Sequence, residues 1–192
     1  MRVLWHRTAH MLTWYRCRKH KGDMHMLITI LLSLMMMAGL FLLLWGGVGF
    51  IQDKKFMSSA PKEALAVVPD RMPERFKGQY AVGYAMVTVA FALMGGAVVI
   101  GAWNGISNGF TFWQFFIRFM IMLLALKAFD VIFFDWVLLC NQGFGFFTHY
   151  YPQVGAVYNR SLFGYNKKDH ITHVICFFPA CALLSWICTL IG

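Results

Sequence analysis

Long runs of apolar residues alternate with shorter polar segments along this chain. A helix needs about 20 mostly apolar residues to cross a hydrocarbon core about 30 Å thick. Four runs reach that length, at about residues 26–50, 80–103, 111–140 and 169–191. The pattern predicts an all-α integral membrane protein, a four-helix bundle over residues 26–192.

Residues 1–25 form a basic segment ahead of the first run. Its apolar residues recur at helical spacing, as at Leu4, Met11 and Tyr15. We therefore expect an N-terminal amphipathic helix lying in the membrane interface, with its aromatic side chains at headgroup depth. A flexible basic tail is the alternative. No small-residue cleavage pattern follows the first run, which indicates an uncleaved anchor.

Turn and capping residues mark the ends of the later runs. Asn104-Gly105 and Asn108-Gly109 are typical of a tight turn. Thr111 with Gln114 three residues later matches a capping box. Together these signals predict that the second and third spans form an antiparallel hairpin. Asp169 is expected to cap the N-terminus of the fourth span.

Segment 52–79 is the longest polar stretch, and three prolines divide it. A surface loop with short helical pieces is expected, one of them starting at Pro61. Within the second run, Gly95-Gly96 indicates close helix packing, with a hinge as the less favoured interpretation.

Composition supports the membrane assignment. Of the 192 residues, 59% are hydrophobic and 13% charged, whereas soluble domains carry roughly a quarter charged residues. The formal charge of +9 argues for anionic lipid headgroups at the basic N-terminus rather than for nucleic acid, because most of the chain must lie in lipid.

The positive-inside rule gives a split count for orientation. The N-terminal segment and loop 52–79 each carry six Lys or Arg residues, and loop 141–170 carries three. Four spans place both termini on one side of the membrane. The denser N-terminal cluster favours the inside for them.

Several kinds of site are not indicated. The five cysteines form no C-x-x-C pair, which argues against a disulfide framework or a thiolate metal site. Nucleotide-binding glycine loops and the G-x-S-x-G motif are missing. We therefore predict neither a metal nor a cofactor.

The third run carries charges well inside it, at Lys127, Asp130 and Asp135. At about 100° per residue, Asp130 lies about 60° to one side of Lys127 and Asp135 about 80° to the other, so the three share a helix face. Asn141 falls near it. Charged residues inside a membrane usually face protein or water and indicate an ion pathway or binding site. The structural alternative is that Lys127 merely neutralises Asp130 while Asp135 faces water.

Histidines supply further candidates for proton or ligand contacts. His170 and His173 lie one helical turn apart beside Asp169, and His149 lies in the preceding aromatic loop. Two histidines at this spacing are able to share a metal. No third ligand is fixed by spacing, so interfacial histidines without a metal are favoured.

Several stretches resemble a known family: APKEALAVVPDRMPERFKGQYAVGYAM, WNGISNGFTFWQFFIRF, KAFDVIFFDW and CFFPACALLSWICTLI. The chain resembles, over roughly residues 52–192, a family of small uncharacterised multi-pass membrane proteins of Firmicutes. The resemblance implies a bacterial cytoplasmic membrane and a four-helix arrangement. It transfers no catalytic residues.

Two classes of function remain open. The favoured one is a non-enzymatic transporter-like unit or a subunit of a membrane complex, because no catalytic motif is present. Four spans would need a homo-oligomer or partner subunits to enclose a path for solute. The alternative is a membrane enzyme acting on a lipid or quinone-like substrate, with Asp130, Asp135, His149 and His170 near one interface.

Overall fold

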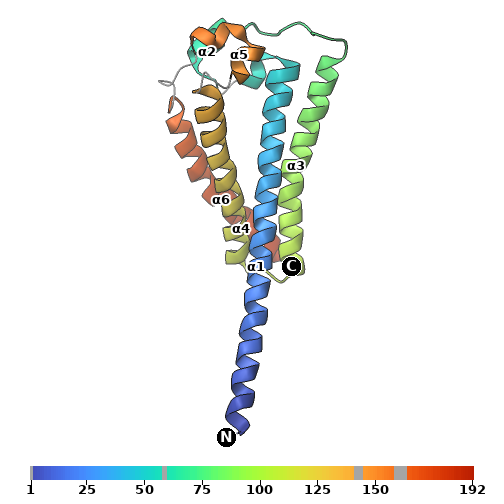
Figure 1. Ribbon diagram of the computed structural model, residues 1–192, viewed down its shortest axis with the longest axis vertical. Coiled ribbons are helices and arrows are strands. Elements are labelled where there is room, and N and C mark those ends of the chain that lie inside the picture. Colours follow the sequence, from blue (N-terminus) through green and yellow to red (C-terminus); the bar gives the residue numbers. More distant parts are fainter. Residues whose placement is uncertain (1, 58–59, 141–144, 158–163) are drawn as a thin grey trace.

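Four long helices make up most of the computed structural model, which describes residues 2–57, 60–140, 145–157 and 164–192, with side chains from residue 22 onward. Every regular element in these ranges is an α-, 3₁₀- or π-helix, so the predicted all-α class is confirmed. The long helices pack side by side (Figure 1): α1 Arg2–Leu44, α3 Gln79–Ser107, α4 Phe112–Phe129 and α6 Lys167–Ile191.

Three of the predicted spans are helices long and apolar enough to cross a membrane, namely Gly22–Ile51, Gln79–Ser107 and Lys167–Ile191. The third predicted span, 111–140, is not one α-helix and is not among these three. It divides into α4, of 18 residues, and the π-helix η3 Asp130–Leu139, which follows directly.

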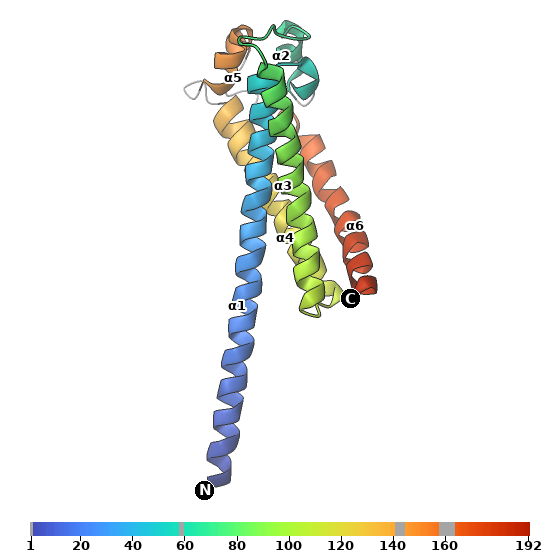
Figure 2. The same cartoon turned by 90° about the vertical axis from the view of Figure 1, so that its right-hand side faces the viewer.

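The N-terminal segment differs from the prediction of a separate helix. α1 runs for 43 residues without a break near residue 25. Its N-terminal part extends along the direction of the bundle, beyond the ends of the other helices (Figures 1 and 2). The segment is therefore a helical extension of the first span. Because residues 2–21 contain neither Gly nor Pro, no helix-breaking residue ends the helix before Gly22.

The α3–α4 hairpin is confirmed, with a shorter turn than predicted. The backbone N–H of Thr111 donates to Gln114 Oε1 at 2.8 Å, as a capping box requires. Asn104-Gly105 lies inside α3, however, and the turn begins only at Asn108. The prediction of Asp169 as an N-cap was also wrong: Asn166 is the N-cap of α6, and Asp169 lies in the first turn.

A cap of short helices covers one end of the long helices (Figures 1 and 2). It comprises η2 Lys54–Met57, α2 Lys62–Val67, α5 Phe146–Tyr150 and η5 Pro152–Ala156, and the π-helix η1 Trp45–Ile51 leads into it as the direct continuation of α1. α2 confirms the helix predicted after Pro61. Segment 52–79 is more than a surface loop. Its residues Met57 and Ala64 share one buried core with η3 and with Val154 from the segment that follows η3.

Buried polar groups attach the cap to the helices. Gln79 is fully buried at the start of α3. Its Nε2 donates to the Phe50 carbonyl at 2.6 Å and to Gln52 Oε1 at 3.0 Å. Its Oε1 accepts from the backbone N–H of Arg75 at 2.9 Å. These hydrogen bonds satisfy backbone groups where the π-helix η1 ends. They therefore fix the position of the cap relative to the long helices.

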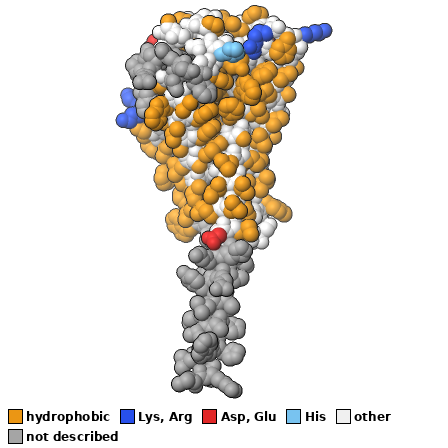
Figure 3. All heavy atoms as spheres, viewed as in Figure 1, with side chains coloured by type: hydrophobic (Ala, Val, Ile, Leu, Met, Phe, Trp, Pro, Cys, Tyr) orange, Lys and Arg blue, Asp and Glu red, His pale blue; other side chains and the backbone are white. Residues whose placement is uncertain are grey.

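Apolar side chains are exposed on all four long helices. Figure 3 shows them over the visible flank, with Lys and Arg gathered near the cap. Examples are Leu31, Phe91, Ile117 and Leu183. So large an exposed apolar surface is unusual for a soluble monomer. It is consistent with helices that cross a membrane.

Candidate functional site

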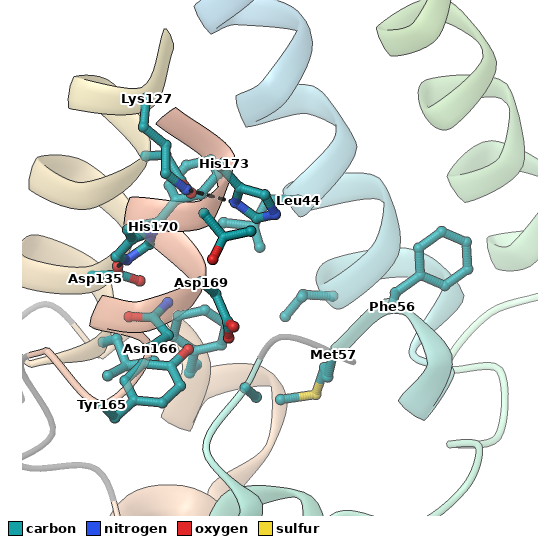
Figure 4. Close-up of a pocket in the computed structure, with 17 residues that line it drawn as sticks. Leu44, Phe56, Met57, Lys127, Asp135, Tyr165, Asn166, Asp169, His170 and His173 are labelled. Atoms are coloured by element: carbon teal, nitrogen blue, oxygen red, sulfur yellow. Dashed lines mark hydrogen bonds and ion pairs between the residues drawn. The ribbon is translucent and has the colours of Figure 1, made fainter. Parts of the chain in front are cut away.

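A cavity of about 320 Å³ lies at the cap end, enclosed by α4–η3, α6 and η1. Its polar lining comes mainly from two helices. Lys127, Asp130 and Asp135 enter from α4–η3, and Asp169, His170 and His173 enter from α6, as Figure 4 shows for most of them. Val48 of η1 and Phe134 and Phe147 supply apolar walls. A pocket of this size with convergent polar groups is the kind that binds small molecules.

The first acid–base pair joins Lys127 and Asp130. The Lys127 Nζ donates to Asp130 Oδ2 at 2.7 Å, and His173 Nδ1 lies 3.4 Å from the same nitrogen. The side chains of Lys127 and Asp130 are mostly buried. The predicted neutralisation on one helix therefore occurs, but in a cavity wall and with a histidine from α6 in contact. An ion pair buried entirely between packed helices would not border a cavity in this way.

The second pair joins Asp135 and His170. Asp135 is only 8% exposed, so it does not face bulk water as the structural alternative required. Its Oδ2 lies 2.7 Å from His170 Nε2, and the side chain of Asn166 also bonds to it. The other ring nitrogen of His170 is buried with no hydrogen-bond partner among the described residues. A carboxylate held against an imidazole is an arrangement that accepts and releases protons.

The π-helical conformation of η3 explains why two carboxylates five residues apart face one cavity. In a π-helix each backbone N–H bonds to the carbonyl five residues earlier, which places residues five apart about one turn apart. The Cys140 N–H bonds in this way to the Asp135 carbonyl at 3.0 Å. Asp130 and Asp135 are thus stacked along one side of η3. Such segments occur frequently at functional sites.

Asp169 is a cavity residue that the sequence interpretation assigned a capping role. It is exposed and lines the cavity, and its side chain makes no ion pair or hydrogen bond with any residue the structure describes. Asn166 and Tyr165 at the start of α6 line the cavity as well. The proximity of Asp169 to His170 and His173 in sequence was the available signal for it.

Not every predicted contact residue reaches the cavity. His149 is exposed in the cap, against the Tyr150 ring at 4.9 Å between centroids, and does not line the cavity. Asn141 lies outside the described residues. Arg118, the other charged residue of α4, faces α3 instead, and its Nη1 donates to the Gly101 carbonyl at 2.8 Å.

The chemistry of the lining limits what the site does. In the described ranges no group of three or more His, Cys, Asp or Glu side chains has the geometry of a metal site. From the described part of the chain, the lining instead offers three carboxylates, one ammonium group and two imidazoles. Groups of these kinds are able to bind polar or charged solutes and to transfer protons.

Comparisons with known proteins add nothing to these observations. No protein-family model, curated protein or solved structure matches the chain.

Proposed function

We propose that this chain is an integral membrane protein with four spans, in which the cavity is the polar site of a transporter-like unit. The observation that carries the proposal is the pairing of Lys127 with Asp130 and of Asp135 with His170 around one cavity. Buried ionisable pairs beside open space suit a site that binds a solute and exchanges protons with it.

The distribution of tryptophan supports a membrane crossing along the long helices. Trp103, Trp113 and Trp186 are exposed toward the end that carries the α3–α4 turn, and Trp45 and Trp136 are exposed toward the cap. Tryptophan is enriched at both membrane interfaces. The α4–η3 unit lies between these two levels and serves in this proposal as the remaining span. The bacterial cytoplasmic membrane, implied by the sequence resemblance, is part of the same proposal.

A homo-oligomer or a membrane complex is the form in which the unit would act. The cavity lies at the cap end only, and below it the helices pack around Phe115, Phe119 and Met122. A path across the whole membrane therefore requires helices from another chain. The basic extension of α1 is proposed to contact anionic headgroups.

The direct test measures proton flux in liposomes that contain the purified full-length protein and a trapped pH-sensitive dye. With a potassium gradient and valinomycin as the driving force, the wild type should change the internal pH faster than empty liposomes. Asp135→Asn removes the proton-accepting carboxylate but keeps its shape. We expect flux to fall on the order of a hundredfold, as when a proton-transfer group is lost.

Asp70→Asn is the matched control, because Asp70 is a fully exposed cap carboxylate whose pairing with Lys54 is loose, at 3.7 Å. It should leave flux unchanged. Equal flux through wild type and Asp135→Asn would overturn the proposal, provided that both elute as single species from gel filtration.

An enzyme acting on a lipid or quinone-like substrate is the second candidate. One observation favours it: an apolar groove on the outer surface shares Lys127 and His170 with the cavity. Against it, no serine or cysteine from the described residues lines the cavity, and His149 lies elsewhere. The transporter-like unit is therefore preferred.

A further inference from the structure

Among the described residues, more carboxylates than ammonium groups line the cavity. Asp130, Asp135 and Asp169 of that part of the chain stand against one ammonium group, that of Lys127. Asp130 is occupied by Lys127 and Asp135 by His170, each at 2.7 Å. The carboxylate of Asp169 has no such partner among the described residues. A cation in the cavity would supply one, whereas an anion would meet repulsion.

Aromatic side chains form part of the wall. Phe134, Phe147 and Tyr165 line the cavity together with Leu44 and Val48. Aromatic faces attract cations, and the attraction strengthens where water is excluded. Such walls favour an organic cation with apolar substituents over a small hydrated metal ion, which prefers several oxygen ligands.

A groove on the outer surface adjoins the cavity wall. It has a volume of about 530 Å³ and lies between α4–η3 and α6, with Leu124, Ala128, Val131, Ile132, Ile171 and Ile175 among its lining residues. Lys127 and His170 belong to both hollows. Because this face of the helices is apolar, a molecule dissolved in the bilayer would settle in the groove, and it would enter the acidic site by passing between Lys127 and His170.

We propose that the site takes a lipophilic organic cation, such as an aromatic phosphonium or quaternary ammonium ion, which arrives from the bilayer through this groove. The inference rests on the proposed transporter-like function and names its substrate class. Asp169 is the main charge contact, and the aromatic wall and the groove hold the apolar substituents.

Binding of radiolabelled tetraphenylphosphonium to the full-length protein in detergent tests the site. The wild type and Asp70→Asn should bind it saturably. Asp169→Asn should weaken binding on the order of tenfold, because it removes one charge from contact with the cation. Neutral triphenylphosphine oxide and anionic tetraphenylborate, both similar in shape, should not compete.

Two outcomes overturn the inference: binding that Asp169→Asn leaves unchanged, and competition by tetraphenylborate. Because Asp169 is exposed, the substitution should not disturb folding, and gel filtration checks this. If cation binding fails while the Asp135-dependent proton flux persists, only the substrate class is wrong. If both fail, the proposed function falls with it.

Access through the groove has its own test in liposomes. Ala128→Trp fills the groove, and Ala92→Trp places the same bulk on an exposed face of α3 away from it. Uptake of tetraphenylphosphonium should slow severalfold in the first variant only. Equal rates in both variants would overturn lateral access.

Discussion

At the scale of single residues, the buried carboxylates of the third predicted span are stabilised by partners on and off their own helix. Lys127 lies three positions from Asp130, and His170 lies 35 positions from Asp135. Burial of an unpaired charge would cost several kcal/mol. The His170–Asp135 contact therefore stabilises the packing of α6 against η3, and both residues also line the cavity.

A double-mutant cycle measures the strength of the His170–Asp135 interaction. Asp135→Asn and His170→Gln, singly and together, should give a coupling free energy of about 1 to 3 kcal/mol, because the two groups are in direct contact and largely buried. The measurement is the free energy of unfolding in mixed detergent micelles.

Lys54→Gln and Asp70→Asn provide the comparison cycle, since that pair is 3.7 Å apart and its carboxylate is solvated. No measurable coupling is expected there. A His170–Asp135 coupling as small as that of the surface pair would mean that the two residues do not interact in solution.

Residue spacing predicted part of the candidate site. On an α-helix the spacing puts Asp130 and Asp135 on either flank of Lys127, and the π-helix η3 brings the two carboxylates closer together; all three residues line the cavity. Spacing within one segment says nothing about a second helix, however. The contacts of His170 and His173 with the third span, and the place of Asp169 in the same cavity, depend on how α6 packs against α4.

At the scale of helices, small residues decide where backbones approach. α3 buries Gly83, Ala90, Ala97, Gly101 and Gly105 along its length. α1 meets this stripe closely: a Cβ on Gly39 would lie 3.0 Å from the Ala90 carbonyl oxygen. Without a hydrophobic force between helices in lipid, such close contact is a main source of association.

The Gly95-Gly96 pair, predicted to mark tight packing, contributes little of it. A Cβ on Gly95 would meet nothing within 4 Å, and one on Gly96 would meet only Met35 Cε at 3.4 Å. Composition showed that α3 has small residues, but not which of them face a neighbour.

Gly105 is the sharpest test of helix contact. A Cβ there would lie 2.2 Å from Cε1 of the Phe115 ring, which is fully buried across the hairpin. Gly105→Ala should destabilise the protein by about 1 to 3 kcal/mol, the usual cost of overpacking. Thermal unfolding in detergent is the measurement.

Gly95→Ala is the control in the same helix. With open space around it and a better helix former in place, stability should stay unchanged or rise by up to about 1 kcal/mol. Equal losses of stability in both variants would contradict the α3–α4 packing described above.

At the scale of the whole molecule, the antiparallel order of the long helices separates two ends. The cap and the cavity lie at one end, and the α3–α4 turn and the C-terminus lie at the other, toward which α1 also extends (Figure 1). If the helices cross a membrane, these two ends must lie on opposite sides of it.

Cysteine labelling in intact cells tests this arrangement. In a variant whose five native cysteines are replaced by alanine, Asn108→Cys marks the turn and Asp70→Cys marks the cap, both at exposed positions. With the N-terminus inside, a membrane-impermeant maleimide should label Cys at position 70 and not at position 108.

Labelling at position 108 alone would mean that the N-terminus lies outside, and it would remain consistent with four spans. Labelling of both positions in intact cells would contradict the crossing itself, once breakage of the cells has been excluded with a cytoplasmic marker protein.

Local sequence determined the features that depend on near neighbours: helical class, the long apolar runs, the α3–α4 hairpin and its capping box, and the shared side of Lys127, Asp130 and Asp135. These follow from hydrophobicity, capping and helical periodicity, which act within a few residues. The tertiary structure decided the rest. Only packing determined that two polar segments form a buried cap, that η3 adopts a π-helical conformation, and that α6 brings His170 and Asp169 to the carboxylates of the third span. Those outcomes depend on contacts between segments far apart in the chain, where no local periodicity specifies a partner.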